Sequence, residues 1–317
     1  MEVVETYTET FRMNYDPTHT TVLRNVFARE MKRRFQELIR AIRIGVGKND
    51  CFELKEKIHT LQITPPVKGS FAFPRSQEKL AAFMKWLERQ VQRGILTIQD
   101  IEQVGTGVEA VWTNLFIADS YKRGVIRARY EMLLAGHIIP SIEDSGGIMA
   151  IVNQPFHVDR LGLLYTRVFK DLKGITDAMD STISRILAQG LADGDGPALL
   201  ARKLVAAING EHLGDLGLQD TMGRTLPALH RAELLARTEV IRAHHVATIQ
   251  EYRNWGVVGI KVKAEWKTAG DNRVCSECAH MEGKVFDLDT IEGMIPLHPL
   301  CRCIALPWIE KLLPYEQ

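Results

Sequence analysis

Residues 275–303 have the sequence CSECAHMEGKVFDLDTIEGMIPLHPLCRC, and this stretch holds four of the five cysteines of the 317-residue chain. It opens on a Cys-x-x-Cys knuckle at 275–278, a turn from which two thiolates can reach one tetrahedral metal ion. It closes on the segment HPLCRC at 298–303, which must fold back onto the knuckle to complete such a site. The spacing therefore predicts that two short segments are clasped together.

The clustering of the cysteines separates this pattern from scattered structural thiols. In a reducing compartment, cysteines grouped in this way indicate a metal site more often than disulfide bonds. We expect one zinc ion held by four of five candidate ligands, namely Cys275, Cys278, His298, Cys301 and Cys303. Disulfide pairing and simple buried thiols are the alternative interpretations.

The choice among the five ligands stays open at the level of sequence. The two knuckle cysteines are the preferred pair, joined by two of the three donors in HPLCRC. Cys301 and Cys303 are separated by one residue, and we expect their side chains to point to opposite sides in an extended segment, so that one packs rather than ligates. Four soft ligands leave no open coordination position, which favours a structural over a catalytic ion. Cys51 stands apart beside Phe52, and we expect a packing thiol there.

The sequence before the knuckle changes from a helical pattern to a strand pattern. The run VVGIKVKAEW at 257–266 is rich in β-branched residues and alternates in part, which predicts a strand or two short ones. Residues 284–286 and 304–306 are its expected partners. A unit of this size buries little apolar area, so a bound metal would contribute on the order of 10 kcal/mol to its folding.

Upstream of residue 257 the chain is predicted to be helical. Asp16-Pro17 offers a start for the first helix, whose apolar residues recur at spacings of three and four as far as Ile42. Gly190 and Gly256 are expected to end two of the later helices. The later helices are expected at about 76–93, 107–134, 158–173, 175–189, 197–208 and 228–254.

These patterns together predict an α+β fold, with a predominantly α-helical body and a small mixed α/β C-terminal zinc-clasped unit. The sequence has two candidate domain boundaries. One is a break rich in Pro, Ser and Gly at 137–155, and the other is the change from a helical to a strand pattern at 257. We therefore expect an N-terminal helical region at 1–150, a second helical part at 151–256 and the β-containing zinc unit at 257–317.

The bulk composition narrows the class of function. The formal net charge of +1 argues against a protein dedicated to coating nucleic acid. No apolar signal region opens the sequence, and no window has the ~18 apolar residues of a membrane helix, so we expect synthesis in a cytoplasm and no membrane partner. One face of the first helix is basic, which fits either a solvated surface or contact with DNA or an acidic partner. Its charged residues are Arg29, Lys32, Arg33, Arg34 and Arg40.

Several motifs follow one another in a recognisable order and spacing. They are Ala236-Arg237-Thr238-Glu239, Trp266-Lys267-Thr268-Ala269, Asp271-Asn272-Arg273-Val274-Cys275, Gly283-x-x-Phe286 and His298-Pro299-x-Cys301-Arg302-Cys303. In this arrangement the chain resembles the phage Mu F-like head morphogenesis family, found in minor head proteins of many tailed phages. The resemblance extends over roughly residues 155–308 and is strongest from residue 236 to residue 303.

The resemblance implies a structural protein of the virion. It implies incorporation into the procapsid at or near the portal vertex, inside the capsid, after synthesis in the host cytoplasm. It also implies contact with the portal protein and a role in head assembly or in DNA packaging and delivery. Capsid or scaffold protein and DNA are the further candidate partners.

The helical motif holds two charged residues that cannot face each other. Arg237 and Glu239 are two positions apart, so each needs a partner of its own. Surface ion pairs with Glu233 and Arg242 are one interpretation. The other is that Arg237 and Glu239 tie the helix to the zinc unit through buried hydrogen bonds.

The motif residues around the knuckle also have structural explanations. Asp271 is placed to accept backbone amides in the turn, and Arg273 to pair with an acid across it. Trp266 belongs to the predicted strand. We therefore expect these three residues to build the site without taking part in chemistry.

Catalytic patterns are sparse in this sequence. It has no Gly-x-x-x-x-Gly-Lys-Ser/Thr loop and no Gly-x-Ser-x-Gly elbow. His244 and His245 are adjacent and would point about 100° apart on a helix, unlike the His pair of a metalloprotease. A zinc-dependent nuclease or another effector carried in the virion would need His280 as a general base. We expect a protein that is not an enzyme, with that effector and a DNA-contacting capsid protein as the alternatives.

Overall fold

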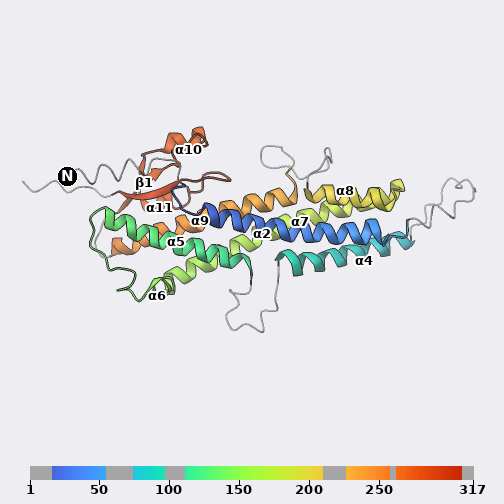
Figure 1. Ribbon diagram of the computed structural model, residues 1–317, viewed down its shortest axis with the longest axis horizontal. Coiled ribbons are helices and arrows are strands. Elements are labelled where there is room, and N and C mark those ends of the chain that lie inside the picture. Colours follow the sequence, from blue (N-terminus) through green and yellow to red (C-terminus); the bar gives the residue numbers. More distant parts are fainter. Residues whose placement is uncertain (1–15, 55–73, 97–110, 210–225, 258–261, 309–317) are drawn as a thin grey trace, which may run out of the picture. The chain divides into compact units, whose positions relative to one another are not determined.

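The computed structural model describes residues 16–54, 74–96, 111–209, 226–257 and 262–308. Most of these residues are helical, and a three-stranded sheet is formed by residues near the C-terminal end of the sequence (Figure 1). The predicted fold class is therefore confirmed. The chain groups into two compact units. The first unit comprises Met1–Phe27, Trp112–Val168 and Leu234–Gln317, and the second comprises Ala28–Val111 and Phe169–Glu233. The domain limits at 150 and 256 stay predictions.

Seven helices and two π-helical segments precede the sheet in the described part of the chain. In order they are α2 (Thr21–Ile42), η1 (Arg43–Lys48), α4 (Pro74–Val91), η2 (Gln92–Leu96), α5 (Thr113–Leu134), α6 (Ile148–Val152), α7 (Pro155–Asp193), α8 (Pro197–Asn209) and α9 (Ala228–Val257). The apolar stripe predicted for the first helix is buried from Phe27 to Ile42. The helix begins at Thr21, later than expected, because the Asp16 carboxylate accepts the N–H groups of Thr18 and Thr20 and closes a turn before it.

The sequence predicts two helices between residues 158 and 189, but the structure has one, because α7 continues through Gly174 and Gly190. A glycine weakens a helix by only about 1 kcal/mol, which burial of the flanking side chains outweighs. At Gly190 a Cβ atom would lie 2.7 Å from Cδ1 of Leu200 on α8 and 2.8 Å from Oδ2 of Asp195. Gly190 is therefore a site of close packing within the second unit and not a helix stop.

Cys51 is exposed, which contradicts the predicted packing role. It lies in the turn that follows η1, where the side chains of Phe52 and Leu54 are buried. Because Phe52 and Leu54 face the core, the alternate positions Cys51 and Glu53 face solvent.

The sheet has the order β2-β1-β3, with β1 (Lys263–Lys267) in the centre. Both neighbours, β2 (Val285–Phe286) and β3 (Ile304–Trp308), run antiparallel to it, and Glu265 pairs with Val285 on one side and Leu306 on the other. Both predicted partners are confirmed. The strand begins later than expected because Val257 still belongs to α9, and residues 258–261 lie outside the described part of the chain.

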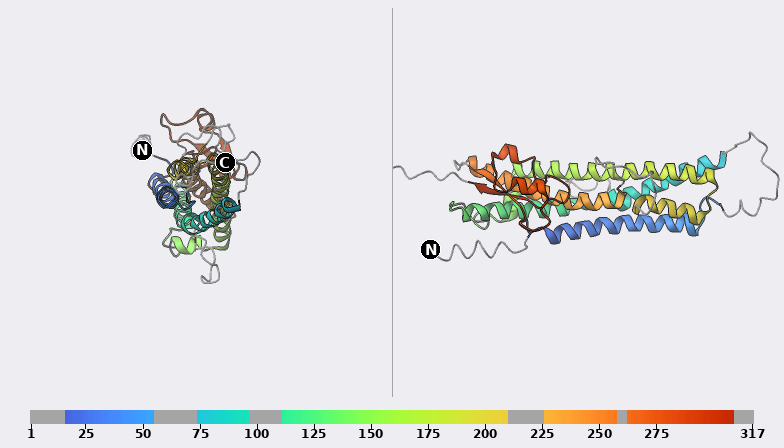
Figure 2. Two further views of the ribbon diagram at one scale, coloured as in Figure 1. Left: turned by 90° about the vertical axis from the view of Figure 1, so that its right-hand side faces the viewer. Right: turned by 90° about the horizontal axis from the view of Figure 1, so that it is seen from above.

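The core of the first unit joins α5, α9 and the sheet. Figure 2 shows the strands close to α5 and the C-terminal part of α9, and Tyr252 on α9 donates its hydroxyl to the carbonyl of Ala305 on β3 (3.3 Å). The two helices approach closely at Gly124, where a Cβ atom would lie 2.3 Å from the carbonyl oxygen of His244. Trp266 on β1 is fully buried in this core. The knuckle at 275–278 is therefore supported by a well-packed core.

Among the described residues, the helices are all too short or too polar to cross a lipid bilayer.

Candidate metal centre

The first ligand segment is a tight turn followed by the short helix α10 (Ser276–Met281). The N–H of Val274 donates to the carbonyl of Asp271, and the N–H of Arg273 donates to its carboxylate, both at 3.1 Å. Cys275 then caps α10, since its Sγ accepts the N–H of Cys278 at 3.3 Å. The turn therefore holds the two knuckle thiols on one side of the chain, as the spacing predicts.

The second ligand segment follows α11 (Leu288–Ile291) and turns sharply between His298 and Cys301. The N–H of Cys301 donates to the carbonyl of His298 at 3.1 Å, and Leu300 has φ +66°, which is rare for a branched side chain. The N–H of Leu300 donates to Oγ1 of Thr238 on α9 at 3.4 Å, which anchors the turn. His298 Nδ1 lies 2.8 Å from the carbonyl oxygen of Pro299, so its Nε2 is left as the metal-binding atom.

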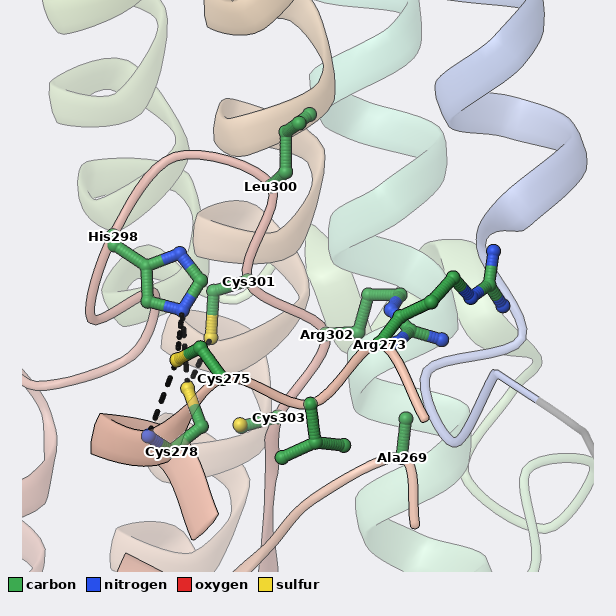
Figure 3. Close-up of a pocket in the computed structure, with 10 residues that line it drawn as sticks. Ala269, Arg273, Cys275, Cys278, His298, Leu300, Cys301, Arg302 and Cys303 are labelled. Atoms are coloured by element: carbon green, nitrogen blue, oxygen red, sulfur yellow. Dashed lines mark hydrogen bonds between the residues drawn. The ribbon is translucent and has the colours of Figure 1, made fainter. Parts of the chain in front are cut away.

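The donor atoms lie within reach of one ion. His298 Nε2 is 3.2 Å from Cys275 Sγ and 3.1 Å from Cys278 Sγ, and Cys278 Sγ is 3.9 Å from Cys301 Sγ (Figure 3). In a tetrahedral zinc site with Zn–S bonds of about 2.3 Å, neighbouring sulfurs lie about 3.8 Å apart. The sulfur pair matches this separation, and the sulfur–nitrogen pairs are a few tenths of an ångström closer than the ~3.5 Å of such a site.

Cys303 also turns toward the cluster. The sequence predicts that Cys301 and Cys303 point to opposite sides, but both sulfurs lie within 4.8 Å of that of Cys278 and of each other. The prediction was wrong because the two cysteines are two positions apart, and side chains at that spacing line the same face of an extended chain. The donors therefore form two groups, and Cys278 belongs to both. The first group also contains Cys275 and His298, and the second also contains Cys301 and Cys303.

The pKa values of the four thiols diverge because closely spaced thiols cannot all carry negative charge. Hydrogen bonding from Cys303 lowers the pKa of Cys301 to about 5. Burial and the neighbouring Cys301 raise the pKa of Cys278 to about 12, and contact with Cys301 together with burial raises the pKa of Cys303 far above its usual range. Metal ligation requires thiolates, and a divalent cation would supply the positive charge that stabilises them. The donor set therefore fits a divalent metal ion.

Asp271 joins the two ligand segments without any metal. Its two carboxylate oxygens each accept a hydrogen bond of 2.6 Å from Arg302, which stands between the candidate ligands Cys301 and Cys303. Arg273 adds a third contact at 2.8 Å, as the sequence predicts. These donors, Arg302 above all, hold the pKa of Asp271 well below its usual range. A bidentate pair of this kind fixes orientation as well as distance.

The helical motif follows the ion-pair interpretation at Glu239 but neither interpretation at Arg237. Glu239 is buried and pairs with Arg242, as expected, and also with Arg167. Arg237 donates to the amide oxygen of Asn25 at 2.9 Å, and among the described residues this is its hydrogen-bonding partner in place of Glu233. The residue between them, Thr238, is the one that reaches the second ligand segment.

Trp266 links the sheet to the knuckle. Its N–H donates to the carbonyl of Lys284 at 2.8 Å, and its carbonyl accepts the N–H of Gly283 at 2.9 Å. Its indole ring packs in the same buried cluster as Cys278 and Cys301. The strand therefore positions the end of α10.

Sequence reasoning missed two anchoring residues on α9. Besides Thr238, His245 contacts the carbonyl oxygen of Ile291 through Nε2 at 2.9 Å. Burial lowers the pKa of His245 to about 4 and that of its neighbour His244 to about 3, so both imidazoles are neutral. Thr238 and His245 are seven residues apart, which is two helical turns, and this spacing on one face was the available signal. His280 is exposed and belongs to neither donor group.

Comparison with known proteins gives one match. Residues 181–306 match the family model described as Phage Mu protein F like protein. No curated protein and no solved structure matches the chain. The matched segment runs from α7 into β3 and contains all five candidate ligands and the motif residues quoted above. Over residues 181–306 this chain is therefore similar to the Phage Mu protein F like family, as the motifs indicate.

Proposed function

We propose that this protein is a structural minor head protein of a tailed phage. In this proposal it is incorporated into the procapsid near the portal vertex, contacts the portal protein, and aids head assembly or the packaging and delivery of DNA. The observation that carries the proposal is the family match, which contains the whole Cys/His cluster. The protein would be synthesised in the host cytoplasm and located in the capsid interior of the virion.

The metal in this proposal is zinc, with a structural role. Three or four thiolates and one imidazole form a soft donor set that suits zinc and does not suit magnesium or calcium. Cys275, Cys278, His298 and Cys301 are the ligands we favour, because contacts between their donor atoms join them in one series. Cys303 then donates its S–H to the Cys301 thiolate, as ligand sulfurs commonly accept hydrogen bonds.

The proposal assigns no catalytic step to this chain. A closed set of four protein ligands leaves no position for a substrate or an activated water molecule. The two histidines of α9 are buried in the core, and burial lowers their pKa values to about 3 and 4, so both are weak bases without access to a substrate. A plasmid cleavage assay with zinc, magnesium or manganese tests this part of the proposal: cleavage that is lost in Cys275→Ser would contradict it.

The decisive test of the proposed function is co-sedimentation with the portal protein of the same phage. We expect the full-length protein to sediment with assembled portal rings and to be present in purified procapsids. Capsid protein, scaffold protein and DNA serve as the other candidate partners in the same assay. The proposal is wrong if the protein associates with none of the head proteins and is absent from purified particles.

A further inference from the structure

Arg237 is a motif residue whose side chain, among the described residues, makes no hydrogen bond or ion pair with the candidate ligands or with the residues that position them; it bonds Asn25 instead. Its guanidinium is half-buried, and within the described part of the chain it bonds only the neutral amide oxygen of Asn25 on α2. A half-buried cation without a carboxylate partner is poorly compensated, because the neutral amide does not replace the lost hydration of the charge. Arg237 is therefore a candidate for contact with an anionic group from outside the chain.

Other guanidinium groups gather beside Arg237. Arg24 pairs with Asp16, and its pKa is lowered by burial and further by the nearby charges of Arg302 and Arg237. Arg302 and Arg273 share Asp271, so four arginines face two carboxylates in this group. Figure 3 shows Arg273 and Arg302 extending away from the cysteines. We call Arg24, Arg237, Arg273 and Arg302, with Asp16 and Asp271, the arginine surface.

Exposed apolar side chains adjoin the arginine surface. Val22 and Val26 flank Asn25 on α2, one turn apart, and are 75% and 37% exposed. Leu300 is 47% exposed, lies in the turn that Thr238 anchors next to Arg237, and points away from the cysteines (Figure 3). Its left-handed backbone conformation is held in place although it is strained for leucine. Strained residues cluster at functional sites, and exposed apolar side chains rimmed by polar residues mark interaction surfaces.

We propose that the arginine surface and Val22, Val26 and Leu300 together dock an acidic amphipathic segment of another phage head protein. Carboxylates of that segment pair with Arg237 and with Arg273, which is 71% exposed. Its apolar side chains pack on Val22, Val26 and Leu300. The excess of guanidinium over carboxylate groups supplies the charge complementarity, and arginine is the residue best suited to bind carboxylates in two-pronged geometry. This inference rests on the proposed function for the identity of the partner.

A protein segment fits this surface better than DNA does. Duplex DNA is bound through a row of exposed cationic side chains that follow closely spaced phosphates. Here Arg24 and Arg302 are 9% and 14% exposed and already paired, and the exposed valines and leucine offer nothing to phosphate. The mixed apolar and basic character therefore favours an acidic helix.

The test uses the full-length protein and three fluorescent probes. These are a synthetic amphipathic peptide of Glu and Leu, a matched peptide of Lys and Leu, and a DNA duplex, each followed by anisotropy. We expect the Glu/Leu peptide to bind, and we expect its affinity to fall as the salt concentration is raised. Arg237→Ala and Val22→Glu should each weaken it about tenfold or more, and Arg237→Lys should weaken it less than Arg237→Ala, since it retains the charge.

Two matched controls keep the test specific. Arg123→Ala removes an exposed arginine from α5, and Leu134→Glu places an acid at a 64% exposed position of the same helix. Both should bind the Glu/Leu peptide as the native protein does. Equal or tighter binding of the Lys/Leu peptide or the duplex, equal weakening by the controls, or no binding of the Glu/Leu peptide would each overturn the docking proposal.

Metal content and portal association are measured on the same samples, which separates the two proposals. A protein that carries zinc and sediments with the portal but does not bind the Glu/Leu peptide refutes the docking surface alone. A protein that binds the Glu/Leu peptide, and loses that binding in Arg237→Ala, supports the surface even if portal association fails.

Discussion

Replacing Asp271 by asparagine should weaken metal binding although Asp271 is not a ligand. The Asp271 carboxylate receives two hydrogen bonds of 2.6 Å from Arg302 and so holds the knuckle against the segment that carries Cys301. Hydrogen bonds to charged groups contribute about 1.5–3 kcal/mol each, and the asparagine amide retains one acceptor oxygen. We therefore expect a loss of about 2 kcal/mol in the preorganisation of the donors, or about 30-fold in metal affinity.

Competition with a chromogenic chelator at neutral pH measures this affinity in the full-length protein. Asp119→Asn is the matched control, because it removes the same charge from an exposed i,i+4 pair with Arg123 on α5. The control should leave metal affinity within about twofold of the native value, as surface pairs contribute ~0–1 kcal/mol. Equal affinities for Asp271→Asn and Asp119→Asn would refute the idea that the Asp271–Arg302 pair preorganises the site.

Asp271 also gives the prediction a pH dependence. Because Arg302 depresses the folded-state pKa of Asp271 below the unfolded value of 3.8, its contribution to stability is present above that value and is lost as pH falls further. Below about pH 4 the native protein should therefore approach the stability of Asp271→Asn, whereas at neutral pH the two should differ. Thermal unfolding of both proteins across this range measures the effect, and a constant difference at every pH would contradict the assignment.

Three further predictions concern the body and the isolated cysteine. Gly124→Ala should cost about 1–3 kcal/mol or more in denaturant unfolding, because its Cβ would lie 2.3 Å from the carbonyl oxygen of His244; Gly162→Ala on α7, with no neighbour within 4 Å, should be neutral or stabilising. Burial and the nearby Asp177 and Glu88 raise the pKa of Asp180 to about 6, so its contribution to stability is lost as pH rises from about 4 through 6. Melting curves of Asp180→Asn should therefore show a higher melting temperature than the native protein at pH 8, and this difference should disappear near pH 4. An unchanged melting temperature at pH 8 would refute the assignment. Cys51→Ser should leave metal content unchanged because Cys51 is exposed and belongs to neither donor group of the described residues; elemental analysis showing a loss would refute this.

The sequence was informative where a local rule decided the structure. The register of β-branched residues and the knuckle spacing predicted the partners of β1 and the two ligand segments, because both depend on short-range periodicity and turn geometry. The long stripe of α2 was equally clear. These features need no knowledge of what packs against them.

The failures came where tertiary contacts override a local rule. Gly190 resembles a helix stop in sequence, yet it is a glycine because Leu200 and Asp195 occupy the space of a side chain. Cys303 is a different case: it stands two positions after Cys301, and side chains at that spacing line one face of an extended chain, so the expectation of opposite sides misapplied the local rule. The pairing of Asp271 with Arg302, 31 positions apart, has no periodicity from which it could be predicted.

The metal content of the native protein tests the central claim most directly. The full-length chain is purified without added metal and without chelator, and its metal is measured by elemental analysis together with the number of free thiols. We expect about one zinc ion per chain, lost in Cys275→Ser and Cys301→Ser and retained in Cys51→Ser. A native protein that contains no metal, with Cys278 joined to Cys301 or Cys303 in a disulfide bond, would contradict the account.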